Sequence, residues 1–175
     1  MRIWLLFLVT ALAGASTAQS ASCNRPWIFF DLGDVLVDTH DWDNLSYKPG
    51  ALAYVRSLRI RGYKLGLIVN IPESWGANQP EKLARLQTEI ATPWREPLAF
   101  PWRSFEVVLL PPSDALRKPD PYLFEQARLR AGDCPAVFQG ENSDEVLTAE
   151  RVGLIPYLVG AADRPFFMPI RALPR

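Results

Sequence analysis

Short, continuous apolar runs alternate with longer stretches of helical periodicity along most of the chain. Each run is only a few residues long, and the runs lie at 27–30, 65–69, 105–110, 136–138 and 155–159. Parallel strands buried on both faces show this pattern, because helices cover such a sheet on each side. The pattern therefore predicts a doubly wound, Rossmann-like α/β fold with a parallel sheet of about five strands.

Four stretches between these runs have the spacing of amphipathic helices. They cover residues 51–61, 80–90, 121–131 and 144–152. Gly62, Gly132 and Gly153 follow three of them as C-caps. Asp120 and Pro121 provide the N-cap and the first-turn proline of the third. We expect these helices to be crossovers that cover the sheet.

One irregular stretch, 92–103, places three prolines among Trp94, Phe100 and Trp102. We interpret this stretch as a rigid aromatic loop. It either covers the core or presents a surface to a substrate or a partner.

The first residues have the order of a secretory signal peptide. Arg2 precedes an apolar run at 5–13, and small residues follow up to Ala18. The run is shorter than the ~20 residues that a membrane-spanning helix needs. We therefore expect residues 1–18 to be removed on export, leaving 19–175 as a single periplasmic or secreted domain without a membrane span.

Composition limits the possible chemistry. Nineteen basic and 19 acidic residues balance without a block of one sign, which argues against a nucleic-acid surface. His40 is the only histidine and no GxSxG turn accompanies it, so a histidine-rich metal site is excluded and a serine triad is disfavoured. The two cysteines of an exported chain suggest one disulfide, with two separate thiols as the alternative.

Polar residues follow the apolar runs where a ligand would bind. Asp31 follows the first run, Asn70 the second, and Gly140-Glu141 the fourth, while Lys118 lies between the third run and the next helix. Ligands of parallel sheets bind at the carboxyl ends of the strands. Carboxylates there can hold Mg²⁺, or attack a phosphorus or carbon centre. A lysine can neutralise the carboxylate and an anionic substrate.

Segments in the right order along the chain resemble the motifs of the haloacid-dehalogenase-like hydrolases. They are 30–38, 47–50 with 62–70, 118–124 and 138–141. The resemblance implies that Asp31 is the nucleophile and that Lys118 and Asn70 steady a phosphoryl group. It also implies that Asp31, the carbonyl of Gly33 and Glu141 hold Mg²⁺. We therefore expect a Mg²⁺-dependent hydrolase, in the first place a phosphatase, acting on a phosphorylated small molecule or a larger phosphorylated substrate.

Three positions depart from the pattern of that family. Gly33 stands where its phosphatases usually carry an acid that protonates the leaving oxygen. We expect Asp34, one residue further along an extended segment, to point the other way. Val69 replaces a phosphate-binding hydroxyl, and Gly140-Glu141 replaces the common pair of acids. These departures keep a second hypothesis open, a catalytically impaired member of the family with a binding role.

The resemblance also bears on the cap and on the cysteines. The segments between Asp31 and Asn70, and between Asn70 and Lys118, leave no room for a separate cap domain. Such an open site favours a large substrate, or one that a partner subunit of an oligomer closes over. In the implied fold the first and fourth strands are parallel neighbours, so Cys23 and Cys134 both fall at the amino edge of the sheet. This arrangement predicts a Cys23–Cys134 disulfide.

Overall fold

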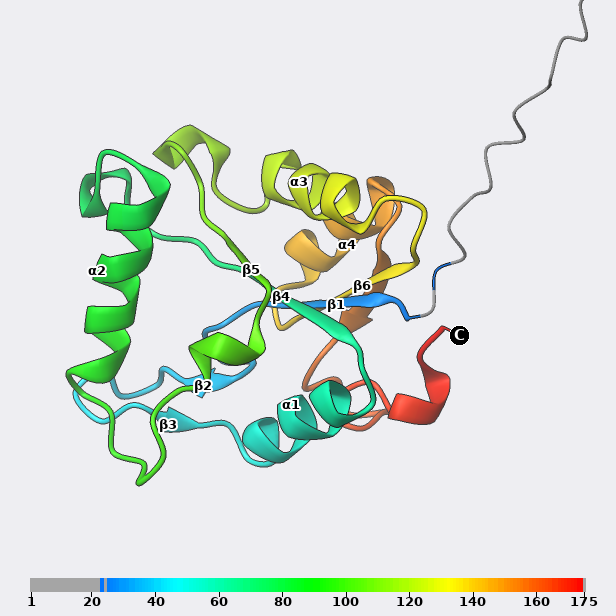
Figure 1. Cartoon of the computed structure of the whole chain (residues 1–175), viewed down its shortest axis with the longest axis horizontal. Helices are drawn as coiled ribbons and strands as arrows, with labels where there is room; N and C mark the ends of the chain where they lie inside the picture. Colours follow the sequence, from blue (N-terminus) through cyan, green and yellow to red (C-terminus); the bar gives the residue numbers. More distant parts are fainter. Residues whose placement is uncertain (1–22, 24, 175) are drawn as a thin grey trace, which may run out of the picture.

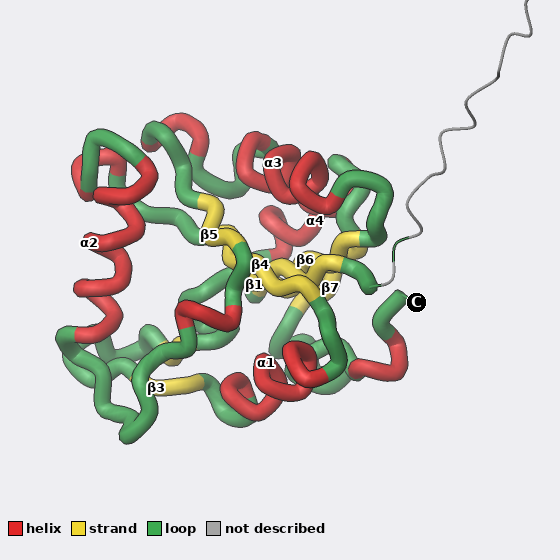
Figure 2. The backbone as a smooth tube through the Cα atoms, in the orientation of Figure 1, coloured by secondary structure: helices red, strands yellow, loops and turns green. Residues whose placement is uncertain are grey.

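The computed structural model describes residue 23 and residues 25–174, which surround one five-stranded sheet (Figures 1 and 2). Its strands are β1 (Trp27–Phe30), β4 (Lys64–Ile68), β5 (Val107–Leu109), β6 (Ala136–Gly140) and β7 (Ile155–Leu158). Their order is β5-β4-β1-β6-β7, and every pair is parallel. The predicted α/β fold class is confirmed. The predicted signal peptide lies outside the described residues.

The helices lie within two residues of their predicted bounds. They are α1 (Ala51–Ile60), α2 (Gln79–Ala91), α3 (Tyr122–Ala131) and α4 (Ser143–Arg151). The predicted start of α3 was wrong by one residue: Pro121 is its N-cap, not Asp120. The Asp120 carboxylate instead lies just outside the helix and accepts a hydrogen bond from the Tyr122 N–H at 2.9 Å.

The alternation of side chains along β1 explains why helices cover both faces of the sheet. Ile28 and Phe30 belong to the core cluster that includes residues of α1, and Trp27 and Phe29 to the cluster of α3 and α4. Figure 1 accordingly shows α1 on one side of the sheet and α3 and α4 on the other. Because complete burial of one such side chain contributes roughly 1.5–3 kcal/mol, these faces fix the sheet between its helices.

Helix α2 departs from the expected role of a crossover that covers the sheet. In Figures 1 and 2 it stands to one side of the strands. Leu86 and Ile90 are both 3% exposed on its inner face, and they line a pocket together with residues at the strand ends. α2 therefore forms a wall beside the carboxyl edge of the sheet.

A small antiparallel pair, β2 (Val37–Asp38) and β3 (Ser46–Tyr47), lies between β1 and α1 and was not predicted. A tight turn leads into it, because the Leu32 carbonyl accepts hydrogen bonds from the N–H groups of Leu36 and Val37. In the part of the chain that the structure describes, no separate cap domain occurs between the strands.

The aromatic stretch 92–103 packs against the end of this pair. Trp94 meets the Tyr47 ring edge-on at 4.8 Å, and Phe100 stacks on Phe105 at 5.8 Å. Phe100 is only 6% exposed. This packing confirms that the stretch covers the core.

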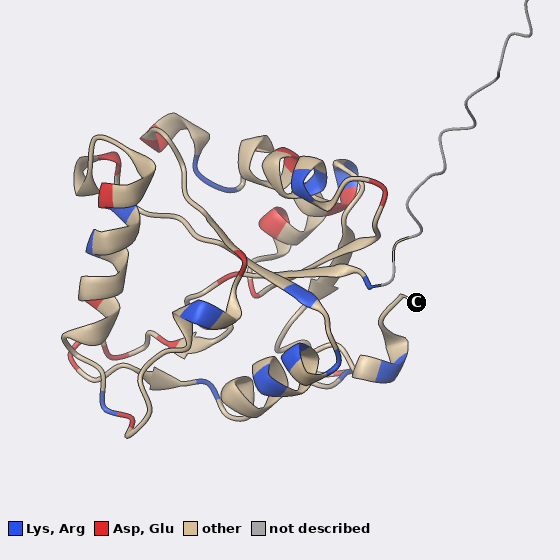
Figure 3. Ribbon diagram, viewed as in Figure 1, with Lys and Arg blue, Asp and Glu red and all other residues tan. Residues whose placement is uncertain are grey.

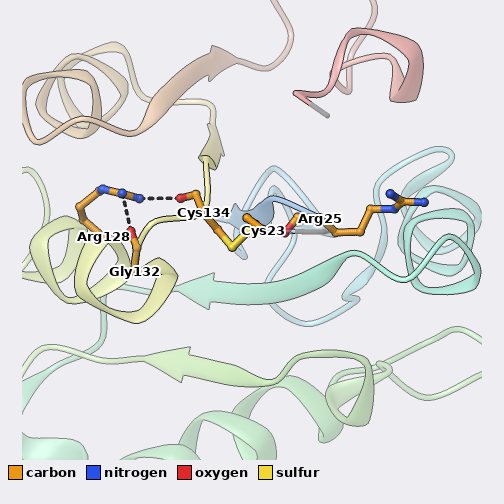
Figure 4. The surroundings of a disulfide bond; sticks show 5 residues. All are labelled: Cys23, Arg25, Arg128, Gly132 and Cys134. Carbon is orange, nitrogen blue, oxygen red and sulfur yellow. Dashed lines mark hydrogen bonds between the residues drawn. A yellow bond between two sulfur atoms is a disulfide. The ribbon is translucent and has the colours of Figure 1, made fainter. Parts of the chain in front are cut away.

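The disulfide joins Cys23 and Cys134, whose Cα atoms lie 5.1 Å apart (Figure 4). Cys23 precedes β1 and Cys134 precedes β6, so the bridge lies at the amino edge of the sheet, as predicted. Such a bridge is compatible with an oxidising compartment. Among the residues described, no helix is long and apolar enough to cross a bilayer.

Candidate active site

The central strands place two carboxylates at one edge of the sheet. β1 and β6 contain no charged residue, and charges of both signs lie on the helices and loops around them (Figure 3). Asp31 and Glu141 are the residues that directly follow these strands. Because β1 and β6 are parallel neighbours, both acids arrive at the same carboxyl edge.

Lys118 is the positive centre of the site. Its Nζ lies 2.7 Å from Oδ2 of Asp31 and 2.7 Å from Oε2 of Glu145, and the whole residue is 5% exposed. Burial alone would lower the pKa of this ammonium, but the negative charges of Asp31 and Glu145 raise it above its usual value. Lys118 therefore stays charged and holds two carboxylates that come from separate elements.

Asn70 has a contact that the sequence did not predict. Its amide Nδ2 donates to the Lys118 carbonyl and its Oδ1 accepts from the Lys118 N–H, both at 2.8 Å. The neighbouring Arg117 also donates through Nε to the Ile71 carbonyl at 2.9 Å. The segment after β4 thus positions the main chain of the lysine, while Asn70 still lines the pocket.

Glu141 and Glu145 add more negative charge than one ammonium neutralises. Burial of the carboxyl and the nearby Asp31 charge raise the pKa of Glu141 to about 7, although much of the residue surface stays exposed. Burial also raises the pKa of Glu145. Oε2 of Glu145 is buried and, among the described residues, has no hydrogen bond beyond its ion pair with Lys118. This excess of oxygen ligands suits a hard divalent cation.

Glu145 is the site residue that sequence reasoning missed. It is the third residue of α4, whereas Glu141 precedes Asn142, the N-cap of that helix. Asn142 caps α4 by accepting hydrogen bonds from the N–H groups of Asp144 and Glu145. Glu145 therefore enters the pocket from the first turn. The signal available in the sequence was an acid three residues after Asn142, in the first turn of the expected helix.

The expectation for Asp34 was wrong. The segment is not extended there, because Asp34 has a left-handed φ of 52° and its N–H donates to the Val37 carbonyl. Its side chain lines the same pocket as Asp31. Thr39 Oγ1 donates to Asp34 Oδ2 at 2.9 Å, and Lys48 Nζ lies 3.1 Å from Oδ1.

These contacts leave the Asp34 carboxylate poorly suited to donate a proton. Partial burial acts to raise its pKa, but the hydrogen bonds from Lys48 and Thr39 outweigh it and hold the pKa below the usual value. Asp34 also forms a close group with Asp38 and His40 that has the composition of a metal site. Lys48 Nζ lies 3.1 and 3.3 Å from the two carboxylates, so a lysine already supplies positive charge there.

The departures from the family pattern have different structural reasons. A Cβ at Gly33 would meet only Thr39, at 3.5 and 3.6 Å, so there is room for a side chain. A Cβ at Gly140 would lie 2.7 Å from the Phe138 ring, which excludes an acid there without repacking. Val69 is 6% exposed and lines the pocket without a hydroxyl.

One pocket of about 270 Å³ contains these groups. Its lining includes the five residues expected from the sequence to bind substrate or metal, which are Asp31, Gly33, Asn70, Lys118 and Glu141. Asp34 and Glu145 also line it. Lys118 contacts Asp31 directly, and its second carboxylate is Glu145 rather than Glu141.

The strand order and the ion pairs at the strand ends define a Rossmann-like α/β protein with carboxylates and a lysine together at the carboxyl edge of its sheet. Its fold is similar to that of solved haloacid-dehalogenase-family enzymes and phosphatases. No protein-family model and no curated protein sequence matches the chain.

The similarity of the fold is shown by solved structures. The D,D-heptose 1.7-bisphosphate phosphatase from B. bronchiseptica, complexed with magnesium and phosphate, is 18% identical with a TM-score of 0.54, over 77% of this chain and 80% of that one. A haloacid-dehalogenase-family enzyme from Bacteroides thetaiotaomicron, in complex with magnesium and inorganic phosphate, is 13% identical with a TM-score of 0.53, over 80% and 96%. A dehalogenase is 15% identical with a TM-score of 0.56, over 81% and 88%.

Proposed function

We propose that the protein is a Mg²⁺-dependent phosphatase with Asp31 as its nucleophile. The observation that carries this proposal is the buried Asp31–Lys118 ion pair, 2.7 Å long, at the carboxyl end of the central strand. Burying two charged groups costs desolvation free energy. Charged groups in such environments therefore occur often at functional sites. The similar structures with bound magnesium and phosphate support the same chemistry.

The chain's own residues would carry out two displacements at phosphorus. An Asp31 oxygen attacks the phosphoryl group, and the bond to the leaving oxygen breaks. The leaving oxygen departs as an anion and takes a proton from solvent. Water then attacks the phosphorus of the aspartyl phosphate and gives up a proton to solvent, which releases inorganic phosphate and regenerates Asp31. Lys118 fixes the orientation of the nucleophile and stabilises negative charge on the phosphoryl oxygens. Asn70 holds the lysine main chain in place and borders the pocket.

The oxygen ligands present fit a magnesium ion. Asp31, the Gly33 carbonyl and Glu141 would hold it, since three carboxylates face a single ammonium. A bound Mg²⁺ supplies charge neutralisation for the phosphoryl group and orients it. Glu145 would act as a positioning residue, because its Oε2 already contacts Lys118.

Turnover of several phosphate compounds tests the proposal. Acetyl phosphate, 1-naphthyl phosphate and a sugar 1-phosphate would be incubated with wild type and with Asp31→Asn, each with Mg²⁺ and with EDTA. We expect release of phosphate by the wild type only, and only with Mg²⁺. Asp31→Asn keeps the shape of the side chain and removes its charge, so equal rates for the two proteins would contradict the proposal.

A second candidate is a binding protein that kept the fold. The absence of an acid at Gly33 and the buried Val69 in place of a hydroxyl favour it. In that case neither protein would hydrolyse phosphate esters. Phosphate would still raise the melting temperature of the wild type in the presence of Mg²⁺, because a ligand stabilises the folded state that binds it.

We also propose that the protein works in the periplasm or outside the cell on a phosphorylated small molecule or a larger phosphorylated substrate. The order of residues 1–18 and the Cys23–Cys134 bridge support export. Cell fractionation and N-terminal sequencing of the mature protein test it. A product in the cytoplasm that retains residues 1–18 would contradict export.

A further inference from the structure

The pocket that contains Asp31 and Lys118 has a second, apolar side. It is formed by residues from the end of β4, from η1 (Glu73–Trp75), from α2 and from the loop after β2: Trp42, Val69, Ile71, Trp75, Leu86 and Ile90. Ile71, Leu86 and Ile90 are 2–3% exposed and thus fixed by packing, whereas Trp42 is 61% exposed. A phosphoryl group alone would not need such a wall.

The wall is a rigid part of the fold. Asn78 caps α2 by accepting a hydrogen bond from the Glu81 N–H at 3.0 Å. The buried Lys82 donates through Nζ to the carbonyls of Pro111 and Pro112, both at 2.8 Å. These contacts tie α2 to the segment after β5, so its apolar face is preorganised beside the site.

The charge that α2 adds to the pocket is already paired. Glu89 lines the pocket, and Arg85, one turn earlier on α2, lies 2.5 Å from its carboxylate. The part of a ligand that rests on this wall therefore meets apolar and aromatic side chains rather than an unpaired acid.

Chemistry at the other end of the pocket limits the leaving group. Gly33 offers no acid, and the Asp34 carboxylate is already engaged, since it accepts a hydrogen bond from Thr39 Oγ1 at 2.9 Å and lies 3.1 Å from Lys48 Nζ. A leaving oxygen must then depart without a proton from these positions. A phenolic hydroxyl has a pKa near about 10, against about 15.7 for water, so a phenolate leaves far more easily than an alkoxide.

We propose that the substrate is an aryl phosphate, the phosphate monoester of a phenol. The ring rests on Trp75, Leu86 and Ile90, with Trp42 at the open side of the pocket, while Asp31 and Lys118 receive the phosphoryl group. This inference rests on the proposed phosphatase function and deepens it. The apolar wall favours contact with a ring, and the lack of an acid at Gly33 independently favours a leaving group that departs without a proton.

Two substrates and three variants test it. Trp42→Ala, Trp75→Ala and, as a control, Leu129→Ala on the exposed face of α3 would be assayed with 1-naphthyl phosphate and with acetyl phosphate, which has no ring. Leu129 is 73% exposed and outside the pocket. We expect both tryptophan variants to raise KM for 1-naphthyl phosphate about ten-fold, consistent with the loss of one aromatic contact. Their kcat/KM for acetyl phosphate should fall far less than that for 1-naphthyl phosphate, and every parameter of Leu129→Ala should change less than two-fold.

A binding measurement separates this inference from the phosphatase proposal. Phenylphosphonate and methylphosphonate resist hydrolysis, and their affinities for the wild type and Trp42→Ala would be measured with Mg²⁺. We expect phenylphosphonate to bind about ten-fold more tightly, and Trp42→Ala to lose that preference. Hydrolysis of phosphate esters without any preference between the phosphonates would overturn the aryl inference alone. A phenyl preference without hydrolysis would overturn the phosphatase proposal and leave the aryl-binding wall in place. Absence of both would overturn both.

Discussion

At the scale of single residues, the decisive feature is the burial of Lys118 between Asp31 and Glu145. A buried charge is tolerated only when it is paired, and both partner distances here are 2.7 Å. The three groups therefore form one unit with a net negative charge. Glu141 lies in the same pocket, where burial and the Asp31 charge raise its pKa to about 7.

Replacement of Lys118 tests this unit through stability. Lys118→Met should lower the free energy of unfolding by roughly 3–5 kcal/mol, because it leaves two buried carboxylates without their counter-charge. The loss would be measured by urea denaturation in EDTA. The double variant with Glu145→Gln should recover part of it, since one uncompensated charge is removed. If Lys118→Met cost less than about 1 kcal/mol and the second change gave no recovery, the ammonium would not be the counter-charge that burial demands.

Replacement of Gly33 by an acid should raise activity rather than lower stability. A Cβ there makes only ordinary contacts with Thr39, so Gly33→Asp should fold. The new carboxyl would supply the missing general acid, and kcat for an alkyl phosphate should rise, at most by the 10²–10⁴-fold typical of such catalysis. Acetyl phosphate, whose leaving group needs no proton, should show little change. Gly33→Ala is the control for backbone effects, and an equal gain in that variant would contradict the role of the acid.

At the scale of elements, the sequence predicted the strands and helices whose positions depend on local residue patterns. The apolar runs gave all five strands of the main sheet, and glycines marked the ends of three helices. The path of the chain between β1 and α1 was not predicted, because the turn that bends at Asp34 depends on hydrogen bonds between Leu32 and residues that follow it. The same turn brought Asp34 into the pocket.

The position of α2 also could not be predicted from the local sequence pattern. Its amphipathic face predicts a helix but not which surface that face meets, and the contacts of Lys82 with Pro111 and Pro112 decide this. Glu145 illustrates the same limit. Asp31 and Glu141 follow apolar strands and were visible as strand-end acids, whereas Glu145 enters the site only because α4 starts at Ser143.

A polar contact between elements joins α1 and β6 to the C-terminal segment. Tyr54 of α1 donates its hydroxyl proton to the Met168 carbonyl at 2.6 Å and accepts a hydrogen bond from Gln139 Nε2 at 3.2 Å. Gln139, fully buried in β6, in turn accepts from the Met168 N–H at 2.9 Å. Tyr54→Phe should therefore cost about 1–2 kcal/mol in the free energy of unfolding.

The same tyrosine gives stability a dependence on pH. Burial raises the pKa of Tyr54 to about 12 from the usual value of 10. A raised folded-state pKa means that this contribution is fully present below about pH 10 and is lost as the pH rises towards 12. In urea titrations across this range, the difference between wild type and Tyr54→Phe should shrink as the pH rises. A constant difference would contradict the role of the neutral hydroxyl as a donor to Met168.

At the scale of the whole molecule, the pocket and the disulfide lie at opposite edges of the sheet. The carboxyl edge carries the pocket with Asp31 and Lys118. The amino edge carries the Cys23–Cys134 bridge (Figure 4). β1 and β6 connect the two edges, since each has a cysteine before it and an acid directly after it. The bridge can therefore stabilise the central strands without touching the chemistry.

This separation predicts that stability and activity respond differently to loss of the disulfide. The bridge spans 111 positions of sequence, and for a loop of about 100 residues the chain-entropy model gives about 4.7 kcal/mol. Replacement of both Cys23 and Cys134 by Ser should thus move the urea midpoint to a clearly lower concentration. Below the transition, the double variant should keep the Mg²⁺-dependent kcat/KM of the wild type within about two-fold, because the pocket lies at the opposite edge. Thiol titration of the denatured, unreduced wild type provides the control and should find no free thiol. Two reactive thiols, or a double variant with unchanged stability, would contradict the bridge as a clamp between the strands.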